Sequence, residues 1–590
     1  MTRTGPDLAL GALGFFVVVF AGAMASVLPR PLDEPADGAG FSTERALAHV
    51  TDLGVEPHVS GSAQHAVVLD RLLAKLRELG VEPAVQRGVA DPPWWLDELP
   101  WLEPDPAPAE GADDPTPRAE DGRPLVPLTN VLVHLPGTAG EGAVLVQAHY
   151  DTKPRSPGAA DNAVGVASLL EALRVLLPGA PYRNDLIFHF DDGEELGLLG
   201  ARLFAEEHPW AKDVRCVLNF DARGNAGPSI CFEVGRGSAV LVERFAAEAR
   251  HPVGASLAAA VYERMRNDTS FSPLRDEGLP GLNFAFVGGA SVYHRPQDVP
   301  ENLSRASLSH QGGYVLAMAR AAAELDLDRL GDDEAVFFNA LPGRLVRYPL
   351  SWSLPLGLGQ LGLVGIVLAL LARRGVRLGA GLGRALLHGA SVLIAVRVVW
   401  WIVDFAVGGV ASVVGFDGEP QGNLWSAMTS GAGLAAAALA TSLALGERAG
   451  EERRAELAAG GALVWSLLLL VSTFALPPAS YIFGWPLAVA LPVLAFARRP
   501  HGAPLPVTAM SFVAIAFVLA PVYALLVQIG SVDPPHMANL GSVLVALGVL
   551  VLQPHLASLL PKRPGGTARA SAVLAVATLA LGTLLGAAGR

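Results

Sequence analysis

The stretch VLVQAHYDTKPRSPGAADNAVG, residues 144–165, sets the pattern for the middle of this chain. An apolar run, 144–146, leads directly into His149 and Asp151, a loop rich in proline and glycine follows, and Asp161 then opens a new helical stretch. We therefore expect a buried strand that ends by presenting side chains able to bind a metal.

The neighbouring segments continue this alternation of strand and helix. Two helices are predicted within residues 41–80, capped by Ser42 and Ser62, before the alternation begins. Strands are predicted at 131–135, 143–148, 186–190, 214–220 and 282–287, with helices at 163–177 and 195–208. This order predicts the α/β class, with a doubly wound, mostly parallel sheet covered on both faces.

Composition indicates that a second part of the chain lies in a membrane. The 590 residues are 51% hydrophobic, and apolar runs are concentrated at 8–28 and after Leu354. The formal net charge is -13, and the sequence shows no basic stripe that could neutralise phosphates, so no nucleic-acid partner is expected. Two cysteines, Cys216 and Cys231, provide no disulfide framework, although a single bridge between them stays possible.

Nine transmembrane helices are predicted, the first at residues 8–28 as an uncleaved anchor in preference to a cleaved signal peptide. The other eight centre on Leu363, Ile394, Ala435, Leu468, Val489, Phe517, Val545 and Ala577. Every second connecting loop is basic, at 373–377, 448–454, 498–499 and 562–569. By the positive-inside rule these loops and the N-terminus are cytoplasmic, and the middle segment is extracytoplasmic.

The predicted domains follow from this division. Residues 1–33 form an N-terminal anchor, 34–348 an extracytoplasmic domain, and 349–590 a membrane domain with about eight helices. Within the middle domain, residues 93–124 are rich in proline and acidic residues and are predicted to form an exposed insertion. We expect an integral membrane protein of a bacterial-type cell membrane, whose partners include the lipid bilayer.

Metal-type side chains follow four of the predicted strands. Ligands of doubly wound sheets bind outside the carboxyl ends of the strands, so these side chains should meet at one edge. They are His149 and Asp151, Glu194 and Glu195, Asp221, and His294. Together with Asp161 they are too many for one tetrahedral catalytic zinc, but they suit two metals that share a carboxylate.

Spacing leaves the division of these residues open. One metal would take His149 with either Glu195 or Asp221, the other would take the remainder with His294, and Asp161 is the natural bridge. Asp151 is placed to orient His149. Of the paired acids, we choose Glu194 as the general base and Glu195 as the ligand, although spacing alone allows the reverse.

The motifs together resemble a known family. The order HYD, AADNAVG, DDGEELGLLGA, NFDARG and VYHRPQDVPENL is similar to the dizinc exopeptidases of metallopeptidase family twenty-eight, which include aminopeptidase Y and bacterial leucyl aminopeptidase. With one span before the domain and eight after it, the chain resembles the membrane-anchored branch that contains vacuolar membrane protease and endoplasmic reticulum metallopeptidase. The resemblance implies a zinc-exopeptidase fold of the phosphorylase/hydrolase-like type.

The resemblance also implies roles for individual residues. Two zinc ions per chain would be bound by His149, Asp161, Glu195, Asp221 and His294, with Asp161 bridging. Glu194 matches the family's general base, which resolves the choice between the paired acids, and Asp151 matches the carboxylate beside the first histidine. Asp268 is a possible substrate contact, but Thr269 stands where soluble relatives carry histidine.

The expected function is therefore a membrane-bound zinc metallopeptidase, of the aminopeptidase type, that hydrolyses peptides or proteins. A water activated by two metals would attack the peptide bond, with Glu194 as general base. Two alternatives are a single-zinc acyltransferase similar to glutaminyl cyclase, and an inert peptidase-like domain on a membrane scaffold or transporter. The oligomeric state does not follow from the sequence.

Overall fold

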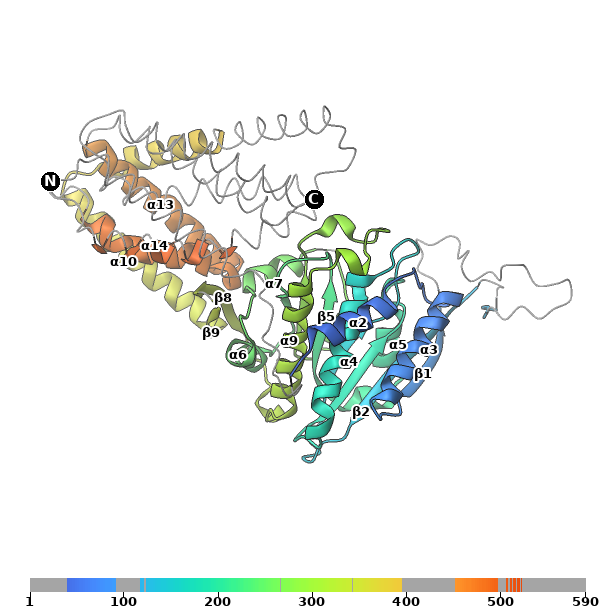
Figure 1. The fold of residues 1–590 in the computed structure, drawn as a ribbon. Coiled ribbons are helices and arrows are strands. Elements are labelled where there is room, and N and C mark those ends of the chain that lie inside the picture. Colours follow the sequence, from blue (N-terminus) through green and yellow to red (C-terminus); the bar gives the residue numbers. More distant parts are fainter. Residues whose placement is uncertain are drawn as a thin grey trace, which may run out of the picture. The chain divides into compact units, whose positions relative to one another are not determined.

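The structure is a computed structural model that describes residues 40–91, 117–120, 124–265, 267–341, 343–394 and 451–496, with short pieces between 506 and 522. The chain divides into two compact units, one of Pro29–Ala335 and one of Met1–Leu28 with Val336–Arg590 (Figure 1). The predicted anchor at 1–33 and most of the predicted insertion at 93–124 lie outside the described residues.

A seven-stranded sheet in the order β1-β2-β4-β3-β5-β7-β6 forms the centre of the first unit (Figure 1). Its strands are β1 (Ala84–Ala90), β2 (Val126–Leu135), β3 (Ala143–His149), β4 (Asp185–Asp191), β5 (Val214–Ala222), β6 (Ile230–Val234) and β7 (Gly281–Phe286). The neighbours β4, β3, β5 and β7 run parallel to one another. All four of these strands were predicted from their apolar runs.

The sheet is mixed, whereas the sequence predicted one that is mostly parallel. β2 runs antiparallel to both β1 and β4, and β6 runs antiparallel to β7. The two edge strands of the sheet, β1 and β6, were not predicted from the sequence. β1 has no fully buried residue, so it lacks the continuous apolar run by which a central strand is recognised.

Helices cover both faces of this sheet, as predicted. Phe284 of β7 packs against Tyr314 of α9 and Phe245 of α6 on one face. On the other face, Phe204 of α5 and Leu274 of α8 lie in one apolar cluster with the central strands. The helices are α2 (Thr43–Leu53), α3 (Ala63–Glu78), α4 (Val164–Leu176), α5 (Leu199–Glu207), α6 (Ala239–Glu248), α7 (Ser256–Tyr262), α8 (Ser272–Asp276) and α9 (Arg305–Ala323).

Local signals account for the N-termini of the first two helices. The hydroxyl of Ser42 accepts a hydrogen bond from the Arg45 amide at the start of α2. The hydroxyl of Ser62 accepts one from the His65 amide, at 3.1 Å, at the start of α3. Each side chain thereby satisfies an amide that has no partner within its helix.

The cysteines are both buried and free, so the possible bridge between them does not form in this structure. Cys216 lies on β5 and Cys231 on the edge strand β6. Because β7 separates these two strands in the sheet order, the cysteines do not lie on neighbouring strands.

The second unit contains a hairpin and apolar helices. The hairpin consists of β8 (Ala335–Leu341) and β9 (Arg344–Pro349), and the helices include α10 (Ser353–Arg373), α13 (Glu451–Ala475) and α14 (Tyr481–Ala495). Among the described residues, two helices are long and apolar enough to cross a membrane, Leu350–Arg373 and Glu452–Ala475. Two shorter apolar helices are Leu378–Ile394 and Tyr481–Ala495.

Three of the nine predicted spans, those centred on Leu363, Leu468 and Val489, lie on these helices. The span centred on Ile394 is described only up to that residue. The span centred on Phe517 is described only in pieces. The spans at 8–28 and around Ala435, Val545 and Ala577 lie outside the described residues. A membrane domain of eight helices therefore stays a prediction.

Buried histidines make the first unit sensitive to acid. Burial lowers the pKa of His58 and His310 to about 4 and that of His189 to about 3, from 6.5. Between pH 6.5 and about 4, these histidines are protonated in the unfolded chain but not in the folded one. The free energy of unfolding should therefore be highest above pH 6.5 and fall as the pH drops towards 4, by on the order of 3 kcal/mol per histidine. Thermal unfolding of the full chain at pH 7, 6, 5 and 4 measures this loss.

The measurement includes a chelator at every pH, so that loss of any bound metal does not contribute. His310→Gln removes one titrating group and should flatten the pH dependence. An unfolding temperature that stays constant from pH 7 to pH 4 would contradict the expectation.

Candidate metal centre

The candidate ligands lie at the carboxyl edge of the four central parallel strands. His149 is the last residue of β3, and Asp221 is the penultimate residue of β5. Glu195 follows β4 and His294 follows β7, while Asp161 lies in an irregular turn just before α4. Because these strands are consecutive in the sheet, residues far apart in the sequence converge on one place.

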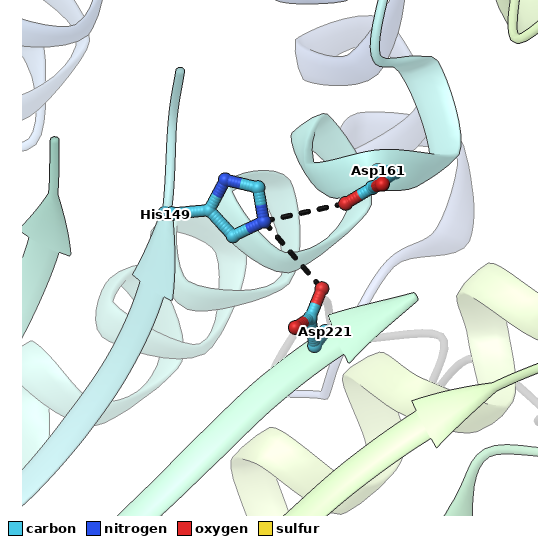
Figure 2. Close-up of side chains that lie close together, drawn as sticks. All are labelled: His149, Asp161 and Asp221. Carbon is cyan, nitrogen blue, oxygen red and sulfur yellow. Dashed lines mark ion pairs between the residues drawn. The ribbon is translucent and has the colours of Figure 1, made fainter. Parts of the chain in front are cut away.

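His149, Asp161 and Asp221 form the first of two groups with the geometry of a metal site (Figure 2). The Nε2 atom of His149 lies 3.3 Å from Oδ1 of Asp161 and 3.5 Å from Oδ1 of Asp221. Figure 2 shows both carboxylates directed at this nitrogen, one from the turn before α4 and one from the end of β5. The three residues offer one nitrogen and two oxygen atoms to a common point.

Asp161, Glu195 and His294 form the second group. The Nε2 atom of His294 lies 3.3 Å from Oδ2 of Asp161 and 3.0 Å from Oε1 of Glu195. Asp161 thus belongs to both groups, with one oxygen facing His149 and the other facing His294. The spacing had left open whether His149 is grouped with Glu195 or with Asp221, and in the structure it is grouped with Asp221.

These atoms are buried and lack ordinary hydrogen bonds. His149 is 2% exposed and Asp161 4% exposed. Among the residues that the structure describes, the Nε2 atoms of both histidines and Oε1 of Glu195 have no hydrogen-bond partner. Buried polar atoms are normally paired, so a set of unpaired nitrogen and oxygen atoms aimed at common points fits bound cations.

Asp151 connects the first histidine to the acidic turn. Its Oδ1 lies 3.3 Å from Nδ1 of His149, the ring nitrogen that faces away from the cluster. The same carboxylate accepts the backbone amides of Glu194, at 3.0 Å, and Glu195, at 3.1 Å. One side chain therefore orients the imidazole and the backbone that carries both glutamates.

The helix predicted at 195–208 begins only at Leu199. Gly193, Gly197 and Leu198 have φ values of 73°, 112° and 63°, which are incompatible with a right-handed helix. Residues 193–198 instead form a turn whose amides are free to bond to Asp151. This turn holds Glu194 and Glu195 at the edge of the sheet.

Two further residues support the cluster and were not assigned a role from the sequence. The carboxylate of Asp298 accepts the amides of Ala160, at 2.8 Å, and Asp161, at 3.1 Å, and so holds the turn that carries Asp161. Lys153 lies 3.2 Å from Oε2 of Glu195. Asp298 occurs in the motif VYHRPQDVPENL, but nothing local indicates that it contacts a turn more than a hundred residues away.

The cluster carries an excess of negative charge. Burial alone lowers the pKa of His149, but the charge of Glu194 and the adjacent carboxylates of Asp151, Asp161 and Asp221 raise it well above 6.5. Without a cation, the site would therefore hold protons on its histidines. Because a metal ion competes with those protons for the same nitrogens, the charge favours cation binding.

The second group shows the same imbalance. Burial lowers the pKa of His294, but the adjacent carboxylates of Asp161 and Glu195 raise it to about 9. Burial raises the pKa of Glu195, and the charge of Asp161 raises it further. Burial also raises the pKa of Glu194 well above 4.5, and the charge of Glu195 adds to this effect.

Asp268 lies outside both groups. Its side chain is 57% exposed and lies 3.8 Å from Nη2 of Arg275. It accepts a hydrogen bond from the Ser272 hydroxyl at 2.9 Å. The hydroxyl of the neighbouring Thr269 accepts a hydrogen bond from the Asn283 side chain at 2.8 Å.

The part of the chain that carries this cluster is similar to a known protein family. Residues 130–319 match the family model described as peptidase family M28. The chain contains a peptidase family M28 domain. The family resemblance inferred from the five motifs is thus confirmed, and the M28 domain includes both groups of candidate ligands together with Glu194.

Curated relatives of the M28 domain have names that refer to membranes or membrane compartments. Endoplasmic reticulum metallopeptidase 1 of Mus musculus is 32% identical over 231 residues, which are 38% of this chain and 26% of that protein. Vacuolar membrane protease of Candida dubliniensis is 31% identical over 225 residues, 38% of this chain and 24% of that protein. The chain spans about a quarter of the length of these relatives.

Solved structures overlap with about half of the chain. A zinc aminopeptidase from Bacillus subtilis is 18% identical and covers 50% of this chain and 97% of its own, with a TM-score of 0.35. A glutaminyl cyclase from Fimbriiglobus ruber is 17% identical and covers 50% of this chain and 98% of its own, also with a TM-score of 0.35. These scores do not favour one of the two activities over the other.

Proposed function

We propose that the chain is a membrane-bound zinc aminopeptidase that hydrolyses peptides with the help of two zinc ions. The observation that carries the proposal is the position of Asp161, whose two oxygens face two separate groups of candidate ligands. One zinc would be held by His149, Asp161 and Asp221, and the other by Asp161, Glu195 and His294. Imidazole nitrogen and carboxylate oxygen are ligands that zinc takes in catalytic sites.

The zinc ions, when bound, would polarise the scissile carbonyl and make a water molecule more acidic. The chain itself supplies the proton transfer. Glu194 has a buried, acidic environment that raises its pKa, which suits it to take a proton from the attacking water and return it to the leaving amine. Asp151 keeps Glu194 in place through the backbone amide and keeps His149 in the correct orientation.

The excess of carboxylates supports an aminopeptidase, because the free amino end of a peptide is positively charged. The negative charge of the site attracts that end. Asp268 stays a candidate contact for the substrate, since its side chain is exposed. The names of the relatives refer to a metallopeptidase and a protease, and neither name specifies an aminopeptidase.

The membrane topology extends the proposal. The basic loops place the domain at 34–348 outside the cytoplasm, with the N-terminus inside and nine spans in total. The substrates would then be extracytoplasmic peptides or proteins. The names of the relatives support an association with membranes and not a particular orientation.

Metal counting on the full chain tests the proposed function. After purification in detergent, we expect two zinc ions per chain and hydrolysis of aminoacyl reporter substrates such as leucine p-nitroanilide. Removal of zinc by a chelator should abolish hydrolysis, and added zinc should restore it, whereas added magnesium serves as the control and should not.

One zinc per chain, with cyclisation of an N-terminal glutamine in place of hydrolysis, would contradict the proposal. Two zinc ions without hydrolysis of any aminoacyl or peptide substrate would favour an inert domain.

A further inference from the structure

Arg223 lies beside the candidate metal centre but takes no part in its ion pairs. It follows β5, two residues after Asp221, and its amide donates to the Phe286 carbonyl at 2.9 Å. The guanidinium carbon lies 5.0 Å from the centre of the Tyr293 ring. Tyr293 in turn stacks on the ring of His294, with 3.6 Å between the ring centres. The guanidinium is thus one aromatic ring away from a candidate zinc ligand.

This guanidinium has no anionic partner among the residues that the structure describes. Asp161, Glu194, Glu195 and Asp221 all belong to the adjoining cluster, yet Arg223 forms an ion pair with none of them. Its Nε is buried and has no hydrogen-bond partner in the described part of the chain. Stacking on an aromatic ring offsets only part of the cost of removing a charge from water. The side chain of Arg223 is half-buried, so it is still accessible to a bound molecule. It is therefore suited to bind an anionic group of a ligand.

The backbone holds Arg223 in this position. A Cβ at Gly224 would lie 2.3 Å from the Gly288 carbonyl oxygen, so the two loops approach more closely than any other residue would allow. The Ala226 amide donates to the same carbonyl at 2.9 Å, and the Asn225 side chain donates to the Asn302 carbonyl at 2.7 Å. The loop after β5 is thus fixed to the loop that leads to Tyr293.

We propose that Arg223 binds the C-terminal carboxylate of the substrate, so that the preferred substrates are dipeptides and tripeptides with a free carboxyl end. This inference rests on the proposed function. A planar guanidinium matches a carboxylate through two parallel hydrogen bonds. A peptide extends by about 3.3–3.6 Å per residue. The carboxylate of a dipeptide or tripeptide therefore lies only one or two residues beyond the scissile bond. Arg223, which is two positions from Asp221, is near enough to bind it.

An acidic side chain of the substrate also offers a carboxylate to Arg223. Three substrates distinguish a C-terminal carboxylate from a side-chain carboxylate. The zinc-loaded full chain is assayed with Leu-Ala, Leu-Ala-amide and Leu-Asp-amide. We expect kcat/KM for Leu-Ala to exceed that for Leu-Ala-amide by about 10- to 100-fold, the usual effect of a hydrogen-bonded charge pair. Leu-Asp-amide should be as poor a substrate as Leu-Ala-amide.

Substitution of Arg223 assigns the effect to this residue. In Arg223→Met the preference for Leu-Ala over its amide should fall to near one, mainly through a higher KM for Leu-Ala, and Arg223→Lys should restore part of it. Arg236→Met is the matched control, because Arg236 is 73% exposed, and it should keep the preference. Zinc content and unfolding temperature, measured for each variant, identify any that misfolds, and Arg223→Lys then provides the test.

Several results would overturn the inference. Equal hydrolysis of Leu-Ala and its amide by the unmodified chain would do so while leaving the proposed peptidase function intact. An unchanged preference in Arg223→Met would assign the carboxylate to another group. Leu-Asp-amide hydrolysed as fast as Leu-Ala would assign the anion to a side chain. Failure to hydrolyse any of the three would count against the proposed function itself.

Discussion

Glu194→Gln should leave two zinc ions bound and reduce peptide hydrolysis by about 10²- to 10⁴-fold, the usual contribution of a general base. The amide has nearly the same shape as the carboxylate but cannot accept a proton. Glu194 belongs to neither group of candidate ligands, and its backbone amide would still bond to Asp151. Zinc per chain and kcat are the two measurements, made on the same preparation.

The control for this variant is Glu206→Gln, the same chemical change at an exposed position of α5. It should affect neither quantity. A Glu194→Gln chain that hydrolyses peptides at the normal rate would remove Glu194 from the role of base. A variant that loses zinc would show instead that Glu194 takes part in metal binding.

Asp161→Asn should weaken both metal sites at once. The carboxylate directs one oxygen to each group, at 3.3 Å from His149 and 3.3 Å from His294. An asparagine has one oxygen, which can face only one group, and it carries no charge. We expect zinc retention to fall at both sites and hydrolysis to fall by at least about 100-fold, since even residues that only support a ligand affect metal affinity by about 10- to 100-fold.

Asp221→Asn and His294→Gln provide the comparison, because each changes one group only. Each should lose about one zinc per chain during dialysis against a graded chelator, while Asp161→Asn should lose more than either. If Asp161→Asn retains as much zinc as these single-site variants, Asp161 does not bridge the two sites.

The main features of the candidate site could be predicted because they follow from local patterns. His149 and Asp221 each end an apolar run, and parallel strands bring such ends to one edge of a sheet. The spacing did not determine which carboxylate pairs with which histidine, since that depends on the turns between strands. The left-handed backbone at Gly193 and Leu198, which moves the start of α5, has no counterpart in hydrophobic periodicity.

Contacts between distant segments were the least predictable part. Asp298 holds the turn of Asp161, and Lys153 approaches Glu195, yet neither residue has a distinctive local pattern. The edge strands β1 and β6 were missed for a related reason. An edge strand that is partly exposed does not need a continuous apolar run, so it resembles a loop in the sequence.

The convergence of four central strands has a consequence for the energetics of metal binding. In small zinc domains the chain becomes ordered only when the metal binds, so the loss of conformational entropy weakens the observed metal affinity. Here the backbone of His149 pairs with β4 and that of Asp221 pairs with β7, so both belong to the sheet itself. The turns of Asp161 and Glu195 are held by the carboxylates of Asp298 and Asp151. The ordering of the ligands is thus part of folding, and metal affinity can reflect the bonds to the ligands themselves.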